Sequence, residues 1–358
     1  MMGESHGLPV GEIAPAHRFD IARLGDYLVA HLPGYAGDLV VQQFQGGASN
    51  PTFLLSARMA HGMAKFVMRK KPPGPLLPSA HQVDREFRIM QALRDTPVPV
   101  PGVHFLCEDD SVIGTAFYVM DFVPGRIIFD ATLPGLANHD RSAVYSSFGE
   151  TLAALHQVDY AAVGLAGLAP QEDYIARQLR RFIKQYRAAE TETIADMETL
   201  IRELPGCVPP DRRTAIVHGD FKLGNMVIHP SEPRLAAVLD WELATIGDPL
   251  ADLAFSALPW HRGIGGKGAL TADSVATGIP TESAYVGAYC RRTGRDHIDG
   301  WNFYLAFALF RLASIMQGVY RRVLSGTVAS DFEAVNTAPA LAAQGLGLLH
   351  GPSRISLD

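Results

Sequence analysis

The hydrophobic and polar positions of this 358-residue chain change their period about a third of the way along it. Before residue 123, short apolar runs bounded by turn-forming or charged residues have the length and spacing of β-strands. These runs cover residues 39–41, 52–55, 65–71, 103–106 and 115–120. Further along, apolar residues mostly recur at three- and four-residue steps, which indicates helices. We therefore expect a sheet first and a mainly helical region second.

Helical spacing predicts helices in both regions. They cover residues 21–31 and 81–93, and then 142–157, 174–187, 193–204, 282–293 and 301–323. Residues 1–17 contain Gly and Pro without a sustained pattern, which predicts a flexible leader. The expected organisation is this leader, a small lobe over residues 18–123 and a larger lobe over residues 124–358.

The stretch from residue 216 to 242 combines short apolar runs with a high density of polar residues. The runs at 215–217, 226–228 and 235–239 have the character of buried strands. Polar residues follow them, so we expect the chemistry to sit at strand ends, where a rigid scaffold can orient side chains.

The polar residues of this stretch are of the types that phosphoryl transfer requires. The pattern H-G-D-x-K-x-x-N contains His218, Asp220, Lys222 and Asn225, and Asp240 opens the sequence D-W-E. The reaction needs a carboxylate to orient and deprotonate a hydroxyl, oxygen ligands for Mg²⁺ and a cation beside the moving charge. We predict Asp220 as the base and Lys222 as the cation, with His218 grouped among the catalytic residues. Asn225 and Asp240 are the predicted metal ligands. The alternative is a polar turn in which these residues are incidental.

The two motifs resemble the Brenner-type catalytic segment of the aminoglycoside phosphotransferase family, within the protein-kinase-like superfamily. They occur in the order typical of that family, with strand-like sequence between them. Gly219 stands where protein kinases have the Arg of H-R-D, which points to the small-molecule branch. The resemblance implies an α+β, bilobal protein-kinase-like fold with a small lobe of β-sheet plus helix and a larger, mainly helical lobe. It also implies ATP and Mg²⁺ as cofactors.

A small-residue turn at 46–51 is a candidate phosphate-binding loop. It contains Ser49 and Asn50, and its backbone amides could approach phosphate oxygens. The alternative is a plain hairpin turn. Its position ahead of the catalytic stretch, as in the resembled family, favours the binding role.

The strand at 65–71 ends in basic residues, and kinase-like enzymes use a Lys on this strand to hold nucleotide phosphates. Here the candidates are Arg69 and Lys70, because the alternation of the strand leaves its register open. An Arg in this place departs from the usual Lys. Glu86 on the following helix is the predicted partner of the cation, with Asp84 as a competitor. A solvated basic strand end is the alternative.

The sequence M-D-F-V-P-G at 120–125 matches the hinge between the lobes of the resembled family. The resemblance implies that backbone groups of Asp121, Phe122 and Val123 hold the adenine ring.

Residues of the helical lobe are expected to support the site. Asp248 is predicted to cap a helix, and Asp252 on that helix braces the catalytic loop in the resembled family. We expect His156 to be structural. Arg311 lies in an apolar helix and is expected to have an acidic partner, because an unpaired buried charge is costly. The Gly-rich loop at 259–270 is a candidate substrate lid, or an ordinary connection.

Charge and cysteine content narrow the function classes. The chain has 37 acidic and 31 basic residues, and this balance disfavours a dominant nucleic-acid surface. Its three cysteines are far apart, which favours isolated thiols in a reducing compartment. We see no secretory signal, and the apolar segment 303–316 is too short to span a bilayer. We expect a cytoplasmic protein without a nucleic-acid or membrane partner; its oligomeric state is left open.

The predicted activity is transfer of the ATP γ-phosphoryl group to a hydroxyl of a small molecule. Residues 69–87 (R-K-K-P-P-G-x-L-L-P-S-A-H, then V-x-R-E-F) look most like the kinase-like domains associated with acyl-CoA dehydrogenases. That resemblance implies a hydroxyacyl acceptor, free or as its CoA ester. The alternatives are an aminoglycoside or another small alcohol as acceptor, and a non-catalytic nucleotide-binding module. A protein kinase is disfavoured because D-F-G and A-P-E motifs are missing.

Overall fold

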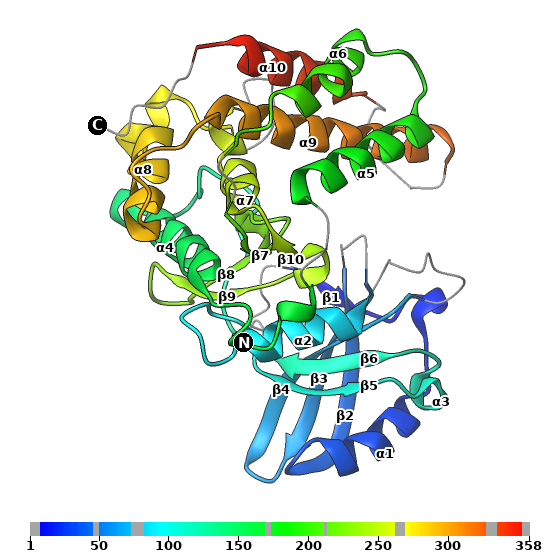
Figure 1. Cartoon of the computed structure of the whole chain (residues 1–358). Helices are drawn as coiled ribbons and strands as arrows, with labels where there is room; N and C mark the ends of the chain where they lie inside the picture. Colours follow the sequence, from blue (N-terminus) through cyan, green and yellow to red (C-terminus); the bar gives the residue numbers. More distant parts are fainter. Residues whose placement is uncertain are drawn as a thin grey trace. The chain divides into compact units, whose positions relative to one another are not determined.

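The computed structural model of the chain describes residues 8–45, 50–72, 82–168, 173–210, 213–261, 269–326 and 335–352. The chain divides into two compact units, whose elements Figure 1 labels. Unit 1 consists of Met1–Phe129 and Leu223–Ala244, and unit 2 consists of Asp130–Lys222 and Thr245–Asp358. The units therefore differ from the predicted lobes in residues 124–129 and in the segment 223–244.

Unit 1 is built on a six-stranded antiparallel sheet with the strand order β1-β2-β3-β4-β6-β5. The strands are β1 (Val10–Gly11), β2 (Tyr35–Phe44), β3 (Thr52–Met59), β4 (Gly62–Lys70), β5 (Val103–Cys107) and β6 (Phe117–Asp121). The helices are α1 (Ile21–His31), α2 (Val83–Leu93) and the short α3 (Asp110–Ile113). The predicted strands and both predicted helices of this region are confirmed.

A hairpin of β8 (Met226–Ile228) and β9 (Leu235–Val238) explains why the segment 223–244 groups with unit 1. The N–H of Arg126 donates to the carbonyl of Ile228 at 2.9 Å, and Ile228 returns the bond at 2.8 Å. The N–H of Val238 donates to the carbonyl of Pro99 at 2.8 Å. Such pairing between distant segments leaves no local trace in the sequence.

The beginning of the described chain differs from the predicted flexible leader. β1 pairs with the end of β2, with Val10 opposite Phe44, and Pro15–His17 forms a 3₁₀ turn. The outer strand of a sheet offers unpaired N–H and C=O groups, so an extended segment can bind there without any periodic pattern of its own.

The main core of unit 1 contains the apolar stripe of α1 and one face of the sheet. Leu24 and Leu28 of α1 are fully buried, and Phe66 and Met68 of β4 belong to the same cluster. Side chains alternate between the two faces of a strand. Arg69 of β4 therefore points to the opposite face, where α2 lies.

Unit 2 is mainly helical. Its helices are α4 (Asn138–Gln157), α5 (Tyr174–Ala189), α6 (Ala195–Glu203), α7 (Pro249–Ser256), α8 (Glu282–Thr293), α9 (Trp301–Leu324) and α10 (Ala338–His350). A two-stranded ladder joins β7 (Ala215–Val217) to β10 (Thr245–Gly247). The Asp248 side chain accepts the Leu250 N–H at 3.0 Å, which confirms the predicted cap of α7. The predicted α+β organisation is thus present, with the sheet in unit 1 and most of the helices in unit 2.

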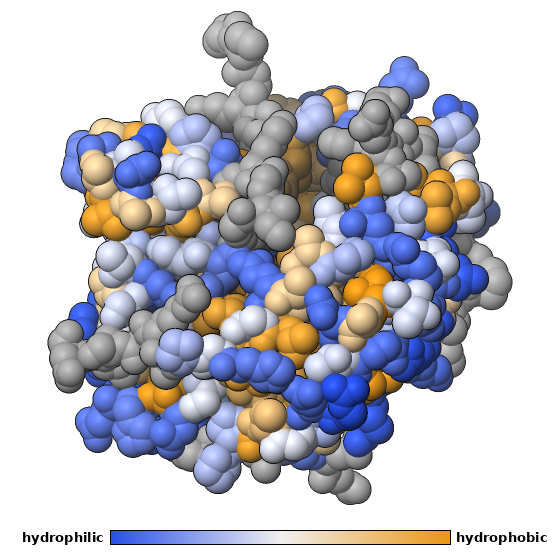
Figure 2. All heavy atoms as spheres, turned by 90° about the horizontal axis from the view of Figure 1, so that it is seen from above, coloured by the Kyte–Doolittle hydropathy of each residue, from blue (hydrophilic) through white to orange (hydrophobic). Residues whose placement is uncertain are grey.

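Helix α9 packs against α5, α7 and α10. The apolar segment 303–316 is part of this longer helix, which was predicted over residues 301–323 and ends at Leu324. Among the described residues it is the one helix long and apolar enough to cross a membrane, and 72% of its most apolar window is buried inside the structure. Burial of this kind is typical of a core helix. On the face shown in Figure 2, hydrophobic residues form separate patches among hydrophilic ones.

Candidate active site

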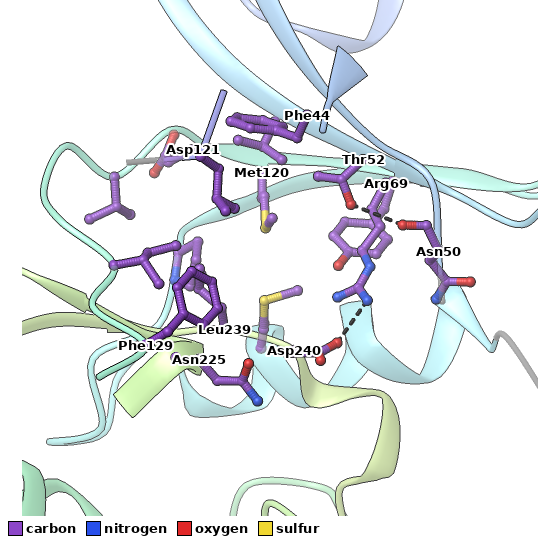
Figure 3. A pocket seen from close by; sticks show the side chains of 18 residues that line it. Phe44, Asn50, Thr52, Arg69, Met120, Asp121, Phe129, Asn225, Leu239 and Asp240 are labelled. Carbon is purple, nitrogen blue, oxygen red and sulfur yellow. Dashed lines mark hydrogen bonds and ion pairs between the residues drawn. The ribbon is translucent and has the colours of Figure 1, made fainter. Parts of the chain in front are cut away.

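A cavity of about 450 Å³ lies within unit 1. Apolar side chains dominate its lining: Leu8, Phe44, Val67, Met90, Met120, Val123, Ile127, Phe129 and Leu239. Polar groups of Asn50, Arg69, Asn225 and Asp240 also border it (Figure 3). A mostly apolar cavity with a few convergent polar groups is typical of a small-molecule site.

Arg69 is the basic residue that faces this cavity. Its Nη1 lies 3.0 Å from Glu86 Oε2. Its Nη2 lies 2.7 Å from Asp240 Oδ1, the contact drawn in Figure 3. The next residue, Lys70, is buried on the opposite face, where its Nζ lies over the rings of Phe19 and Phe53 at 5.3 and 5.9 Å. Strand alternation therefore places Arg69, and not Lys70, at the cavity, where it pairs with the predicted Glu86.

Glu86 is fully buried on α2 and receives three donors. Besides Arg69, they are the Asn50 amide at 2.7 Å and the Tyr118 hydroxyl at 2.9 Å. Burial raises the pKa of Glu86 to about 7, against the opposing effect of the Arg69 charge; nearby Asp240 adds to the rise. Burial alone would lower the pKa of Arg69, but the charges of Glu86 and Asp240 raise it overall. Arg69 therefore stays charged while the carboxylates compete for it.

The D-W-E turn is held against α2. The guanidinium of Arg85 donates to the carbonyl of Ala244 at 2.7 and 3.1 Å, and the indole of Trp241 donates to the carbonyl of Val238 at 3.0 Å. Asp240 has a left-handed backbone (φ 66°, ψ 60°), which a non-glycine residue adopts at a cost. Such backbone strain is concentrated at functional sites, and here it places the carboxylate beside Arg69.

Glu242 is a site residue that the sequence analysis missed. Its Oε2 lies 3.8 Å from Arg69 Nη2, so the guanidinium faces three carboxylates, from Glu86, Asp240 and Glu242. The signal was available, because Glu242 follows Asp240 by two residues in the same motif. Its role becomes visible only in the structure, where the turn brings the carboxylates of Asp240 and Glu242 toward Arg69.

The donor groups fit a hard divalent cation. One guanidinium does not balance three carboxylates, so a further positive charge is favoured beside Asp240. Asn225 and Asp240 both border the cavity, and a carboxylate plus an amide, completed by phosphate oxygens, is a ligand set that suits Mg²⁺. Within the described ranges no cluster of three His, Cys, Asp or Glu residues is arranged to hold a metal by itself. The two predicted ligands would therefore rely on a nucleotide to complete the site.

Of the three predicted hinge residues, Asp121 and Val123 border the cavity and Phe122 is not part of its lining. The N–H of Asp121 is already donated to the carbonyl of Gly102 at 2.7 Å, and its carboxylate lies 2.7 Å from His104 Nε2. The ring of Phe122 lies under Lys65 Nζ at 5.4 Å. Val123 borders the cavity, and its main chain has no hydrogen bond within the described ranges. Val123 is thus the hinge residue whose backbone is available to a ligand.

Two other predicted regions are only partly described. Ser49 lies outside the described residues, while its neighbour Asn50 is buried and donates to Glu86. In the predicted lid at 259–270, residues 262–268 lie outside the described residues.

The catalytic loop belongs to unit 2 and follows strand β7. Asp252 of α7 is fully buried, and its two carboxylate oxygens accept the N–H groups of His218 and Gly219, the latter at 2.8 Å. Burial alone would raise the pKa of Asp252, but the neighbouring His156 and His218 and the hydrogen bond from the Gly219 N–H lower it overall. Asp252 therefore remains an anion that fixes the loop backbone, as the resemblance implied.

His218 is buried and holds the backbone of the catalytic loop. Its side chain is fully buried, and its Nδ1 accepts the N–H of Asp220 at 3.2 Å. The sequence analysis placed it among the catalytic residues, which burial argues against. Asp220 is partly accessible, and Lys222 Nζ lies 2.8 Å from its Oδ2. The predicted base and cation are thus in contact at the end of the loop.

His156 is structural, as expected. Its ring is buried, with Nδ1 2.7 Å from the Tyr289 hydroxyl and Nε2 3.6 Å from Asp252 Oδ2, which is long for a hydrogen bond. Burial lowers the pKa of His156, so the ring is neutral near pH 7.

The unit boundary passes through the H-G-D-x-K-x-x-N motif, between Lys222 and Leu223. Asp220 and Lys222 belong to unit 2, whereas Asn225 and Asp240 belong to unit 1. The assignment of a base and a metal site to these residues stays a prediction.

Comparisons with known proteins agree with this description. A family model described as "Phosphotransferase enzyme family" matches residues 40–301. Mouse (Mus musculus) acyl-CoA dehydrogenase family member 10 is 48% identical over 297 residues, which cover 82% of this chain and 27% of that protein. Human (Homo sapiens) acyl-CoA dehydrogenase family member 11 is 43% identical over 351 residues, which cover 95% of this chain and 44% of that protein. This chain therefore spans less than half the length of either relative.

Among solved structures, a crystal structure from Ralstonia eutropha, provisionally named an aminoglycoside phosphotransferase, is 43% identical. The alignment covers 93% of this chain and 98% of that one, with a TM-score of 0.83. The predicted resemblance and the kinase-like α+β fold are thereby confirmed.

Proposed function

This chain belongs to the phosphotransferase enzyme family, and from that premise we propose that it transfers the γ-phosphoryl group of ATP to a hydroxyl of a small molecule. The observation that carries this proposal is the charge arrangement in unit 1. Arg69, Glu86 and Asp240 form one connected set at a mostly apolar cavity of about 450 Å³. Such a cavity can accept a base and ribose, with the charged groups near the phosphates.

Each residue of the proposed site has a role that its surroundings support. The free backbone of Val123 would recognise the adenine edge, and Arg69 would hold phosphate oxygens with its planar fork. Asn225 and Asp240 would hold Mg²⁺, which supplies charge neutralisation on the β- and γ-phosphates when it is bound.

The chemical step would depend on the loop of unit 2. Asp220 would orient the acceptor hydroxyl and take its proton, and Lys222 would offset the charge that moves during transfer. The hydrogen bonds that the side chains of Asp252 and His218 accept from the backbone support these roles, because they hold the chain on both sides of Gly219.

We propose a hydroxyacyl compound, free or as its CoA ester, as the acceptor. The support is the similarity to proteins named for acyl-CoA dehydrogenases, which covers nearly the whole of this chain. An aminoglycoside is the alternative acceptor, supported by the provisional name of the Ralstonia eutropha protein.

A non-catalytic nucleotide-binding module is the second candidate function, and one observation favours it. Asp240 is already engaged by Arg69 at 2.7 Å, so a metal would have to compete with a guanidinium for this carboxylate. For catalysis, the Mg²⁺–nucleotide complex must displace Arg69 from Asp240 or share this carboxylate with it. A binding module could keep the Arg69–Asp240 contact intact.

A substrate screen tests the proposal. Purified chain with ATP and Mg²⁺ is presented with hydroxyacyl-CoA esters, free hydroxy acids, choline-like alcohols and aminoglycosides, and acceptor-dependent ADP release is measured. We expect release with a hydroxyacyl compound, its loss when EDTA is added, and a phosphate ester in the ³¹P spectrum of the product. ATP binding without acceptor-dependent ADP release across the panel would instead support the binding module.

A further inference from the structure

Helix α9 carries a buried arginine for which the sequence analysis expected an acidic partner. Arg311 is only 6% exposed and lies among aromatic and aliphatic residues of unit 2. The expectation is wrong, because no carboxylate lies within ion-pair distance of it in the described ranges. Burying a charge without a counterion is costly, so its retention calls for a specific role.

The hydrogen bond that Arg311 makes is directed at the catalytic loop. Its Nη2 donates to the carbonyl of Gly219, the residue immediately before the proposed base. Its Nε has no acceptor within the described part of the chain. The guanidinium is instead held by two rings, with its Cζ 4.6 Å from the centroid of Phe255 and 5.3 Å from that of Phe182. The stacking replaces part of the lost hydration and fixes the plane of the fork.

The Gly219 carbonyl belongs to the peptide plane that joins Gly219 to Asp220. A hydrogen bond to this carbonyl therefore acts directly on the backbone of Asp220. Gly219 has a positive φ of 82°, so this plane is turned sharply relative to the preceding strand. On the N–H side, Asp252 accepts from His218 and Gly219. Arg311 binds the opposite, carbonyl side of the same residue. Together the two side chains specify the orientation of the peptide that carries Asp220.

We infer that Arg311 is a positioning residue for phosphoryl transfer, acting through the Gly219 carbonyl on the orientation of Asp220. This inference rests on the proposed function, because it assigns Arg311 to the reaction in which Asp220 is the base. An anion at this place would repel the carbonyl, and a hydrocarbon would leave it without a donor, so a buried cation with a planar fork suits the task. Neither ring contact nor burial alone would require a donor aimed at this carbonyl.

The test compares Arg311→Met, Arg311→Lys and a matched control on the same helix. Arg321 also donates from α9 to a backbone carbonyl, that of Ala188, far along the chain from the loop. Arg321→Met therefore removes the same type of bond without touching the catalytic loop. For each variant, kcat and the KM for ATP are measured with the acceptor found by the screen.

We expect Arg311→Met to lower kcat by roughly 10–100-fold, because a small misplacement of a catalytic group has effects of this size. The KM for ATP should change by less than about twofold, since binding groups of unit 1 are untouched. Arg311→Lys, which keeps the charge and a donor group but not the planar fork, should have an intermediate kcat, and Arg321→Met should match the wild type. A wild-type kcat in Arg311→Met would overturn the inference, as would an equal loss in Arg321→Met.

Two measures keep the inference testable if a variant or the activity fails. Should Arg311→Met not fold, Arg311→Lys decides: a reduced kcat at unchanged KM supports the inference, and a wild-type kcat refutes it. Should the wild type phosphorylate no acceptor, the proposed function fails by itself. Hydrogen exchange of residues 215–222 then tests the positioning role: faster exchange in Arg311→Met than in Arg321→Met supports it, and equal exchange refutes it.

Discussion

Two buried arginines, one in each unit, have different kinds of partner. Arg69 in unit 1 faces three carboxylates, at 3.0, 2.7 and 3.8 Å. Arg311 in unit 2 faces a backbone carbonyl and two aromatic rings, with no acid within ion-pair distance in the described ranges. The first is part of a polar cluster that borders a cavity, so a ligand can exchange with its partners. The second is enclosed, so it can only hold the backbone in place.

The comparison shows that the partners of a buried arginine decide its role. It can help to bind a ligand, or it can hold the backbone in one orientation. A guanidinium among carboxylates forms a cluster in which the cation can attract phosphate and the carboxylates can attract a metal ion. A charge among rings and a carbonyl adds directional constraint, at the cost of desolvation. We therefore expect substitutions in unit 1 to change binding and stability, and substitutions in the loop of unit 2 to change turnover.

The largest expected effect is that of removing the proposed base. Asp220→Asn keeps the shape of the side chain but cannot accept a proton, so kcat should fall by roughly 10²–10⁴-fold. The Kd for ATP, measured by titration calorimetry, should change by less than about threefold, because the cavity belongs to unit 1. Asp240→Asn is the contrasting variant, for which the Mg²⁺ requirement should rise. Unchanged turnover in Asp220→Asn would remove the role assigned to this residue.

Removal of Arg69 should have the largest effect on stability. Arg69→Met leaves Glu86 buried beside Asp240 without its counterion, and breaking a buried pair typically costs about 3–5 kcal/mol. Urea unfolding measures the loss. In Arg69→Met/Glu86→Gln the buried charge is absent as well, so the double variant should be more stable than the single one. If Arg69→Met were as stable as the wild type, the cluster would not be a structural element of unit 1.

Much of the fold could be predicted because its elements carry local periodicity. Helices 21–31 and 282–293 begin and end where the pattern placed them, as α1 and α8. The strand β1 could not be predicted, because two residues contain no period and their pairing depends on an open edge. The hairpin of β8 and β9 was identified as strands, but its membership in unit 1 depends on bonds to residues over 100 positions away.

The candidate site was predicted less completely, for reasons that are physical. The pairing of Arg69 with Glu86 was anticipated, but the choice between Arg69 and Lys70 needed the register of the sheet. Glu242 was missed because its relevance depends on a turn with a left-handed residue. Arg311 was given the wrong partner, because a counterion is the usual solution for a buried charge and a backbone carbonyl is a rarer one.

One buried titratable residue in each unit should also make the free energy of unfolding depend on pH, and the two dependences should have opposite signs. The pKa of Glu86 is raised in the folded state to about 7 from an ordinary 4.5. Between these two values the folded state binds a proton that the unfolded state has lost. The resulting stabilisation of the folded state is fully present below about pH 4.5 and is lost as the pH rises through 7. This contribution to the free energy of unfolding is about 3 kcal/mol, because each pKa unit corresponds to about 1.36 kcal/mol. The pKa of His156 is lowered, so its contribution is present above pH 6.5 and is lost on acidification.

Urea unfolding between pH 4 and 8 measures both contributions. The stability difference between wild type and Glu86→Gln should decrease with rising pH over the range 4.5–7. The difference between wild type and His156→Gln should increase with rising pH up to about 6.5. Parallel pH profiles for wild type and Glu86→Gln would contradict the raised pKa of this buried carboxyl.

The smallest expected effect is that of replacing a glycine in unit 2. It distinguishes a change in the orientation of the catalytic loop from a general loss of stability. Gly219 and Gly326 both have a positive φ, 82° and 67°, and an alanine at such a position costs about 1–2 kcal/mol. Gly219→Ala and Gly326→Ala should therefore lose similar stability in thermal unfolding. Only Gly219→Ala should lower kcat, because only there does the strained peptide carry the proposed base and accept the Arg311 hydrogen bond. An equal kcat in the two variants would show that the turn at Gly219 tolerates rearrangement, and the distinction between a ligand-binding arginine and a loop-positioning arginine would lose its main support.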